Sequence, residues 1–237
     1  MKKQHLFLAA ILFLGLASIG IKAQQPAQVS SLATAERIAN LDDLKAQLRQ
    51  YHECTCKCGC YAKDLDRQAQ QAIDFLCTRA AQRSPEEKLA LVLDIDETTL
   101  SNYEEMQKVD FAYNSKVFSA WVETAKAPAI PGTLRLYQEA QRLGVQVFFI
   151  TGRPDTQRAA TERNLRSQGF QNWRQLAMRS PAQAKQATPA YKSAARAAIQ
   201  VQGYKIVLNV GDQWSDLKGQ PEAEFSVKYP DPFYFIP

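Results

Sequence analysis

Apolar residues along this chain form two patterns, short segments of strand length and longer stripes with helical spacing. Apolar residues three and four positions apart predict helices at 131–143, 155–167 and 189–202. The strand-like segments are 89–93, 145–150, 173–178, 204–210 and 225–228. A strand that is apolar throughout is expected where helices cover both faces of a sheet, and strand–helix–strand connections imply parallel pairing. The pattern therefore predicts an α/β fold, a three-layer sandwich around a central parallel sheet.

Two further helices are predicted before the first strand. Apolar residues recur at helical spacing over 32–48 and again over 65–80. We interpret residues 24–84 as a helical N-terminal extension that packs on the main domain, residues 85–237. The expected role of this extension is structural.

A segment of different composition, residues 101–130, separates the first strand from the next helix. It is rich in aromatic residues, and Ser115 stands where it can cap a short helix within the segment. Asp155 likewise stands where it can cap the helix that follows the second strand. The aromatic rings could stack on a flat ligand or form the segment's own core, and both interpretations are open.

The first 23 residues have the layout of a secretory signal peptide. Lys2 and Lys3 precede an apolar stretch at 6–19, and small residues follow near Ala23. The alternative is an uncleaved membrane anchor, but the stretch is shorter than the roughly 20 residues of a spanning helix. No cysteine follows it to accept a lipid. We expect an exported chain, periplasmic or secreted, with no stable membrane anchor.

Composition and charge exclude some classes of partner. With 237 residues and 46% hydrophobic side chains, the chain can bury a complete core. The formal charge is +5, and cleavage after residue 23 would remove three lysines and no acid, leaving +2. Because this charge is small and the basic residues are dispersed, we expect binding neither to nucleic acid nor to a membrane surface.

The cysteines are concentrated in one short region. The five are Cys54, Cys56, Cys58, Cys60 and Cys77. Export would permit disulfides. Neither the alternating spacing nor the odd total matches a standard zinc pattern, which usually has two-residue gaps. Local disulfides, a metal site and free thiols are all open.

Two carboxylates stand directly after the first strand. Asp94 follows residues 89–93, and Asp96 lies one pleat repeat later, so both project from the same side if the strand geometry persists. Ligands of parallel sheets bind at the carboxyl ends of the strands. Other polar residues end a predicted strand or lead to one: Thr151, Lys192, Asp212 and Asp216. We expect all of these side chains to meet at one edge of the sheet.

These motifs resemble those of a known superfamily. Asp94-Ile95-Asp96-Glu97-Thr98 matches the D-x-D-x-T signature of haloacid-dehalogenase-like (HAD) phosphatases, and the later Thr, Lys and GD-x-x-x-D follow in the same order. Five local sequences resemble those of subfamily IIIB, the class B-like acid phosphatases. They are LDIDETTLSN, ITGR, YKS, NVGDQWSDL and KYPDPFYFIP. The resemblance covers about residues 50 to 237. It implies a HAD-like Rossmannoid fold, with residues 101–130 as a small cap insert.

The resemblance also implies a reaction, the hydrolysis of small phosphate monoesters, with nucleotides among the candidates. Asp94 would attack phosphorus and become an aspartyl-phosphate, which divides a very slow reaction into two steps. Asp96 would protonate the departing oxygen and later take a proton from the hydrolytic water, a role typically worth about 10² to 10⁴ in rate.

A magnesium ion is the implied cofactor. It is expected between Asp94, the backbone carbonyl of Asp96 and Asp212, with Asp216 in support. Hard oxygen ligands of this kind suit magnesium.

Three further side chains are candidates for the phosphoryl group. Thr151 would donate a hydrogen bond to its oxygens, and Lys192 would neutralise charge that develops in the transition state. Arg153 is a candidate substrate contact.

The proton on Asp96 leads to an expectation about pH. Asp94 and a dianionic substrate would raise the pKa of Asp96, whereas magnesium and Lys192 would lower it. We expect a balance that leaves Asp96 partly protonated only in mildly acidic solution, and therefore an acid pH optimum.

Other functions would require different residues. A storage or binding protein on the same fold would be expected to lose the nucleophile, and Asp94 is present. A dehalogenase or phosphonatase of this superfamily would lack the second acid, Asp96. A secreted metal-binding protein organised on the cysteines would depend on residues 54–60 more than on Asp94.

Overall fold

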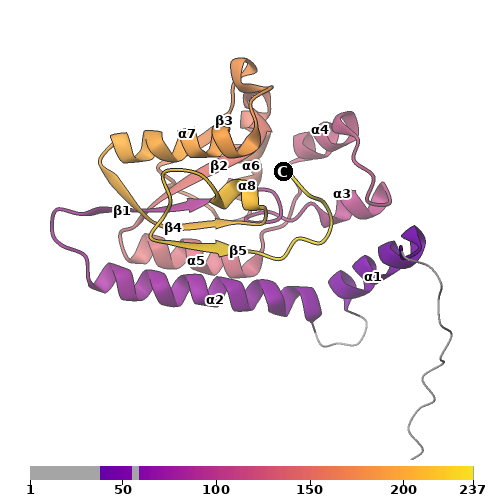
Figure 1. Cartoon of the computed structure of the whole chain (residues 1–237), viewed down its shortest axis with the longest axis horizontal. Coiled ribbons are helices and arrows are strands. Elements are labelled where there is room, and N and C mark those ends of the chain that lie inside the picture. Colours follow the sequence, from indigo (N-terminus) through magenta and orange to yellow (C-terminus); the bar gives the residue numbers. More distant parts are fainter. Residues whose placement is uncertain (1–37, 55–58, 237) are drawn as a thin grey trace, which may run out of the picture. The chain divides into compact units, whose positions relative to one another are not determined.

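The computed structural model describes residues 38–54 and 59–236, and residues 39–237 belong to one compact unit (Figure 1). The predicted signal peptide, the start of the first predicted helix, Cys56 and Cys58 lie outside the described residues. Within those residues, no helix has both the length and the apolar character needed to cross a membrane.

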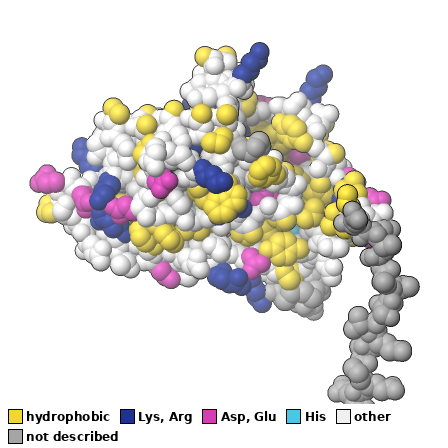
Figure 2. Space-filling model, in the orientation of Figure 1, with side chains coloured by type: hydrophobic (Ala, Val, Ile, Leu, Met, Phe, Trp, Pro, Cys, Tyr) yellow, Lys and Arg dark blue, Asp and Glu magenta, His cyan; other side chains and the backbone are white. Residues whose placement is uncertain are grey.

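The face shown in Figure 2 carries Lys and Arg side chains dispersed among Asp and Glu.

The centre of the unit is a five-stranded sheet in the order β3-β2-β1-β4-β5. Its strands are β1 (Lys88–Leu93), β2 (Gln146–Pro154), β3 (Gln175–Arg179), β4 (Tyr204–Gly211) and β5 (Phe225–Lys228). Every neighbouring pair is parallel, which confirms the predicted sheet. The chain passes from β3 at one edge to β4 on the far side of β1. The strand order therefore reverses beside β1 and β4, where ligands bind in such sheets.

Alternate residues of β1 face opposite layers of helices. Leu91 and its neighbours two positions away pack into the larger core cluster, whereas Ala90 and Val92 pack into a second cluster with α7 (Thr188–Val201). Figure 1 shows α7 on one side of the sheet and both α2 (Cys60–Ala81) and α5 (Pro131–Arg142) on the other. The three-layer sandwich is thus the consequence of a strand that is apolar on both faces.

Helix α2, from the predicted N-terminal extension, supplies part of an outer layer of the sandwich. Its buried stripe includes Leu65, Ala69, Ala72 and Leu76. At Gly132 in α5, a Cβ atom would lie 2.6 Å from the Cβ of Ala69, so the absent side chain lets the two helices approach closely.

The described residues contain further helices. They are α1 (Leu41–Glu53), α3 (Tyr103–Lys108), α4 (Ser115–Thr124), α6 (Arg158–Ser167), α8 (Trp214–Leu217) and the short 3-10 turns η1 (Asp155–Gln157) and η2 (Pro181–Gln183). Helices α3 and α4 lie in the segment 101–130, directly after β1.

Several predicted boundaries were wrong. The first predicted helix, 32–48, included residues 38–40, which are not helical, and α1 begins at Leu41. The cap of α4 is Asn114, whose backbone is extended and whose Oδ1 accepts from the backbone nitrogens of the next turn at 3.0 and 3.2 Å, whereas Ser115 is already helical. Asp155 begins η1 and pairs with Arg158 instead of capping α6. Strand β2 was expected to stop after residue 150, but it continues to Pro154 through a shift in register against β3.

The described cysteines lie in two places. Cys54 and Cys60 flank the junction of α1 and α2 with their sulfur atoms 3.6 Å apart. The Cys77 thiol lies 3.1 Å from a carboxylate oxygen of Glu139 and donates to it.

Candidate active site

The carboxyl ends of β1 and β4 bring three acids together. The backbone N–H of Asp94 donates to the carbonyl of Val210 at 3.0 Å, which ties the end of β1 to the end of β4. Asp212 follows β4 directly, and Asp216 lies on α8. Asp94, Asp212 and Asp216 are buried, and one carboxylate oxygen from each lies within 4.8 Å of the others. The structure thus brings Asp94, Asp212 and Asp216 together, as predicted.

Lys192 reaches this group from α7. Its ammonium nitrogen contacts Asp94 Oδ1, lies 2.8 Å from Asp216 Oδ1 and donates to the carbonyl of Ile150 at 2.7 Å. Only 3% of the residue is exposed. The lysine therefore bridges two of the three carboxylates and lies beside the predicted nucleophile.

Neighbouring side chains hold the acids of the β4 loop. Thr98 donates through Oγ1 to Asp212 Oδ1 at 2.9 Å, and Gln213 donates through Nε2 to Asp212 Oδ2 at 2.8 Å. The backbone N–H of Gln213 donates to Asp216 Oδ2 at 2.9 Å. At Gly211, a Cβ would lie 2.4 Å from the Cβ of Asp216, so only glycine allows this loop to close on itself. The D-x-D-x-T signature contained Thr98 without assigning it a role, and no sequence signal indicated Gln213.

The charges of these acids are poorly balanced. Burial raises the pKa of Asp94 to about 7, with Asp216 and Asp96 adding to the effect and Lys192 opposing it. Burial, together with Asp216, Asp94 and Asp231, raises the pKa of Asp212 well above its usual value. One lysine faces three buried carboxylates, and a divalent cation would supply the missing positive charge. The donors are all oxygen atoms, which fits a hard cation such as Mg²⁺.

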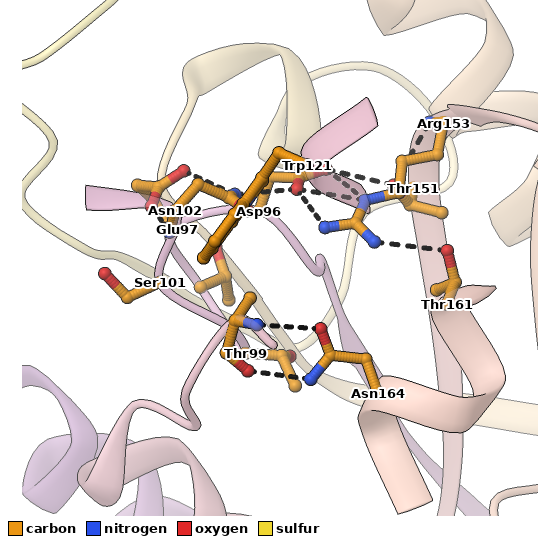
Figure 3. Close-up of polar contacts among 12 residues, drawn as sticks. Asp96, Glu97, Thr99, Ser101, Asn102, Trp121, Thr151, Arg153, Thr161 and Asn164 are labelled. Carbon is orange, nitrogen blue, oxygen red and sulfur yellow. Dashed lines mark hydrogen bonds and ion pairs between the residues drawn. The ribbon is translucent and has the colours of Figure 1, made fainter. Parts of the chain in front are cut away.

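Asp96 has a different environment from the other acids (Figure 3). Arg153 Nε lies 3.0 and 3.2 Å from its two carboxylate oxygens, and Arg153 Nη2 lies 2.7 Å from Oδ1. Asn102 donates to the same Oδ1 through Nδ2 at 2.9 Å. Arg153, predicted as a substrate contact, is thus the partner of Asp96. Because β1 ends at Leu93, the strand geometry does not persist to Asp96 as the sequence-based expectation assumed.

The expected pKa of Asp96 was a balance that included a dianionic substrate and magnesium, and it stays a prediction. Burial does raise the pKa of Asp96, but attraction and hydrogen bonds from Arg153, with help from Asn102 and Lys192, outweigh burial and bring the pKa below its usual value. Arg153 therefore adds an attraction to those expected from the sequence.

Thr151 lies beside this ion pair. It is fully buried in β2, and its hydroxyl accepts from the backbone N–H of Arg153 at 3.1 Å. The same hydroxyl lies 3.4 Å from Asp96 Oδ2 as a weak donor. Its expected contact with a phosphoryl group stays a prediction.

A cavity of about 640 Å³ opens above these residues. Its floor includes Asp94, Asp96, Lys192, Asp212 and Asp216. Its walls come from the segment 101–130, with Phe111, Tyr113 and Phe118, and from the tail residues 233–236. A phosphate ester could therefore meet the acids at the floor while its organic part contacts apolar and aromatic side chains.

The C-terminal tail is attached to the acid loop through Gln213. Its Nε2 donates to Asp231 Oδ2 at 2.6 Å, and its Oε1 accepts from the backbone of Ile236 at 3.1 Å. Phe233 is 8% exposed and packs into the larger core cluster, whereas Phe235 is 73% exposed at the cavity wall.

A parallel sheet with these acids and a buried lysine at its carboxyl edge is the arrangement that the sequence led us to expect of HAD phosphatases. The class C acid phosphatase of Bacillus anthracis, solved with tungstate bound, has the same fold, with a TM-score of 0.66 and 22% identity over 81% of this chain and 86% of that one. The chain belongs to the HAD superfamily, subfamily IIIB (acid phosphatase), whose family model matches residues 17–237.

Curated relatives include an enzyme and a storage protein. Acid phosphatase 1 of Solanum lycopersicum is 35% identical over 179 residues, which cover 74% of this chain and 69% of that protein. Vegetative storage protein 1 of Arabidopsis thaliana is 32% identical over 151 residues, covering 62% and 55%. The chain is thus a member of a phosphatase family some of whose relatives are named for storage.

Proposed function

We propose that this protein is a periplasmic or secreted, Mg²⁺-dependent acid phosphatase that hydrolyses small phosphate monoesters through an aspartyl-phosphate. The observation that carries the proposal is the buried carboxylate of Asp94, which contacts the Lys192 ammonium at the floor of a cavity. A storage protein has no need of a nucleophile placed in this way.

Asp94 is the nucleophile in this proposal. One of its carboxylate oxygens forms a bond to phosphorus while the bond from phosphorus to the ester oxygen breaks. Its backbone is fixed from both sides, because its N–H donates to β4 and its carbonyl accepts from Thr99 Oγ1 at 2.5 Å. Lys192 lowers the pKa of Asp94 against the effect of burial, which keeps part of it in the ionised, reactive form.

Asp96 serves as the acid and then as the base. Its proton passes to the ester oxygen as the first bond breaks, and it takes a proton from the water that later cleaves the Asp94–phosphorus bond. Since Arg153 favours the ionised form of Asp96, the protonated form is available only at low pH or when a dianionic substrate offsets the arginine. An acid pH optimum follows.

Asp94, Asp212 and Asp216, with the backbone carbonyl of Asp96, would hold Mg²⁺, which supplies positive charge against the anionic phosphoryl group. Around it, Lys192 neutralises charge on the phosphoryl oxygens, and Thr98 and Gln213 keep Asp212 oriented.

We expect chelation to lower phosphate release at least about 100-fold, because such an ion contributes several kcal/mol of transition-state stabilisation. The measurement is phosphate release from a panel of nucleotides and aryl phosphates, with chelator and after addition of Mg²⁺. Asp212→Asn should raise the Mg²⁺ concentration needed for half activity more than it lowers the melting temperature. Full activity in excess chelator would count against the metal, and no release from any ester would favour a storage role.

The location in this proposal rests on the sequence of residues 1–23, with two lysines before an apolar stretch. Expression in a bacterial host should yield a chain in the periplasmic or medium fraction that lacks these residues by mass spectrometry. Recovery from the membrane fraction with residues 1–23 attached would contradict export as a cleaved protein.

A further inference from the structure

Asn102 is the second side chain that touches Asp96, and it is fully buried. Asp96 Oδ1 accepts three hydrogen bonds at 3.0 Å or less, two from Arg153 and one from Asn102 Nδ2. Asp96 Oδ2 has only longer contacts, 3.2 Å to Arg153 Nε and 3.4 Å to Thr151 Oγ1. Oδ2 is thus the less tightly held of the two oxygens.

The amide of Asn102 is fixed in one orientation by its neighbours (Figure 3). Trp121 donates through Nε1 to Asn102 Oδ1 at 2.9 Å. Glu97 Oε2 accepts from Asn102 Nδ2 at 3.0 Å, and Glu97 Oε1 accepts from its backbone N–H at 2.5 Å. An indole nitrogen only donates and the ionised carboxylate of Asp96 only accepts, so the opposite amide orientation would lose the contacts with both Trp121 and Asp96.

Trp121 connects this amide to helix α4. The indole belongs to α4 and is 8% exposed. Other residues of the same helix, Ser115, Phe118 and Ser119, line the cavity. The orientation of Asp96 therefore depends on the element that would contact the organic part of a substrate.

We infer that Asn102 is a positioning residue that presents Asp96 Oδ2 to the leaving oxygen, and that Trp121 links this position to helix α4. The inference rests on the proposed function, because it assumes that Asp96 is the general acid. Glu97 and Trp121 hold the amide, the amide and Arg153 hold Oδ1, and the less tightly held Oδ2 is left for the leaving oxygen.

The test exploits the fact that a poor leaving group needs a proton and a good one needs little. Asn102→Asp has nearly the same size but places an acceptor against Asp96 and Glu97. We expect it to lower kcat/KM for an alkyl phosphate about 10- to 100-fold more than for p-nitrophenyl phosphate, a part of the full acid–base contribution. Equal losses on both esters would mean that Asn102 has only a structural role, and would overturn the inference.

A second variant keeps the test decisive if Asn102→Asp does not fold. Trp121→Phe removes the indole N–H and keeps most of the ring volume, and it should shift the ratio of the two kcat/KM values in the same direction, about 3- to 10-fold. Trp173→Phe is the matched control, since that partly buried ring packs against Phe149 elsewhere in the sheet and should leave the ratio unchanged. An unchanged ratio in Trp121→Phe would refute the link to α4.

A double-mutant cycle separates this inference from the proposed function. In an Asp96→Asn background, Asn102→Asp should no longer change the ratio, because the acid through which it acts is missing. A selective effect that persisted without Asp96 would overturn the positioning role. If the unaltered protein hydrolysed neither ester, the proposed function itself would have failed.

Discussion

Asp94→Asn is expected to lower phosphate release from every ester by at least about 10⁴-fold, because no phosphoryl acceptor remains. The fold should persist, since Lys192 keeps its contacts with Asp216 at 2.8 Å and with the carbonyl of Ile150 at 2.7 Å, so no buried charge loses its only partner. Activity on p-nitrophenyl phosphate and on an alkyl phosphate, with a melting curve for each variant, is the measurement.

Two comparisons make the result specific. Asp43→Asn changes an exposed aspartate of α1 in the same way and should leave activity intact. Acid quenching of the unaltered protein during turnover should yield a chain carrying one phosphate, which Asp94→Asn lacks. If the variant kept a few per cent of the activity, or the phosphate were found on another residue, Asp94 would not be the nucleophile.

Much of this site was predictable because its main residues stand next to recognisable elements. Asp94 and Asp212 directly follow apolar strands, and parallel strands bring their carboxyl ends to one edge. The family resemblance then identified Lys192, which by itself is an ordinary helix lysine.

The roles of Arg153 and Trp121 were not predicted, because their partners are distant in sequence. Arg153 and Asp96 are 57 positions apart, and their contact depends on the irregular end of β2, which the apolar pattern did not reveal. Asn102 and Trp121 meet only once α4 has folded back over the site. Hydrophobic periodicity indicates which face of an element is buried, but it carries no information on which polar groups meet across elements.

The stability of the metal-free protein should fall as pH rises from about 5 to 8. Burial raises the pKa of Asp94 to about 7, of Glu97 to about 8 and of Asp231 to about 6, and it also raises that of Asp212. An acid whose pKa is higher in the folded than in the unfolded chain stabilises the fold below its unfolded pKa, near about 4. That contribution is lost as pH rises through the folded pKa.

Other groups act against this trend or outside its range. Burial lowers the pKa of His52, which favours the neutral ring and costs stability as pH falls. The lowered pKa values of Glu87 and Glu139, both about 2, come first from hydrogen bonds to arginines and matter only below about pH 4. Four acids with raised pKa values outweigh one histidine with a lowered pKa. The folded protein therefore loses stability as pH rises towards 8.

We therefore expect the melting temperature in chelator to fall by at least about 5 °C between pH 5 and pH 8. One unit of pKa shift corresponds to about 1.4 kcal/mol, and about 1 kcal/mol moves the melting temperature of a chain this size by about 2 to 4 °C. Mg²⁺ should raise it more at pH 8 than at pH 5, because the ion binds ionised carboxylates and competes with their protons. Glu97→Gln, which replaces an acid outside the three-carboxylate group by a neutral side chain of the same shape, should flatten the fall between pH 7 and pH 8. A melting temperature in chelator that rose with pH would show that the buried acids are ionised without cost, and would remove the charge imbalance on which the metal site was inferred.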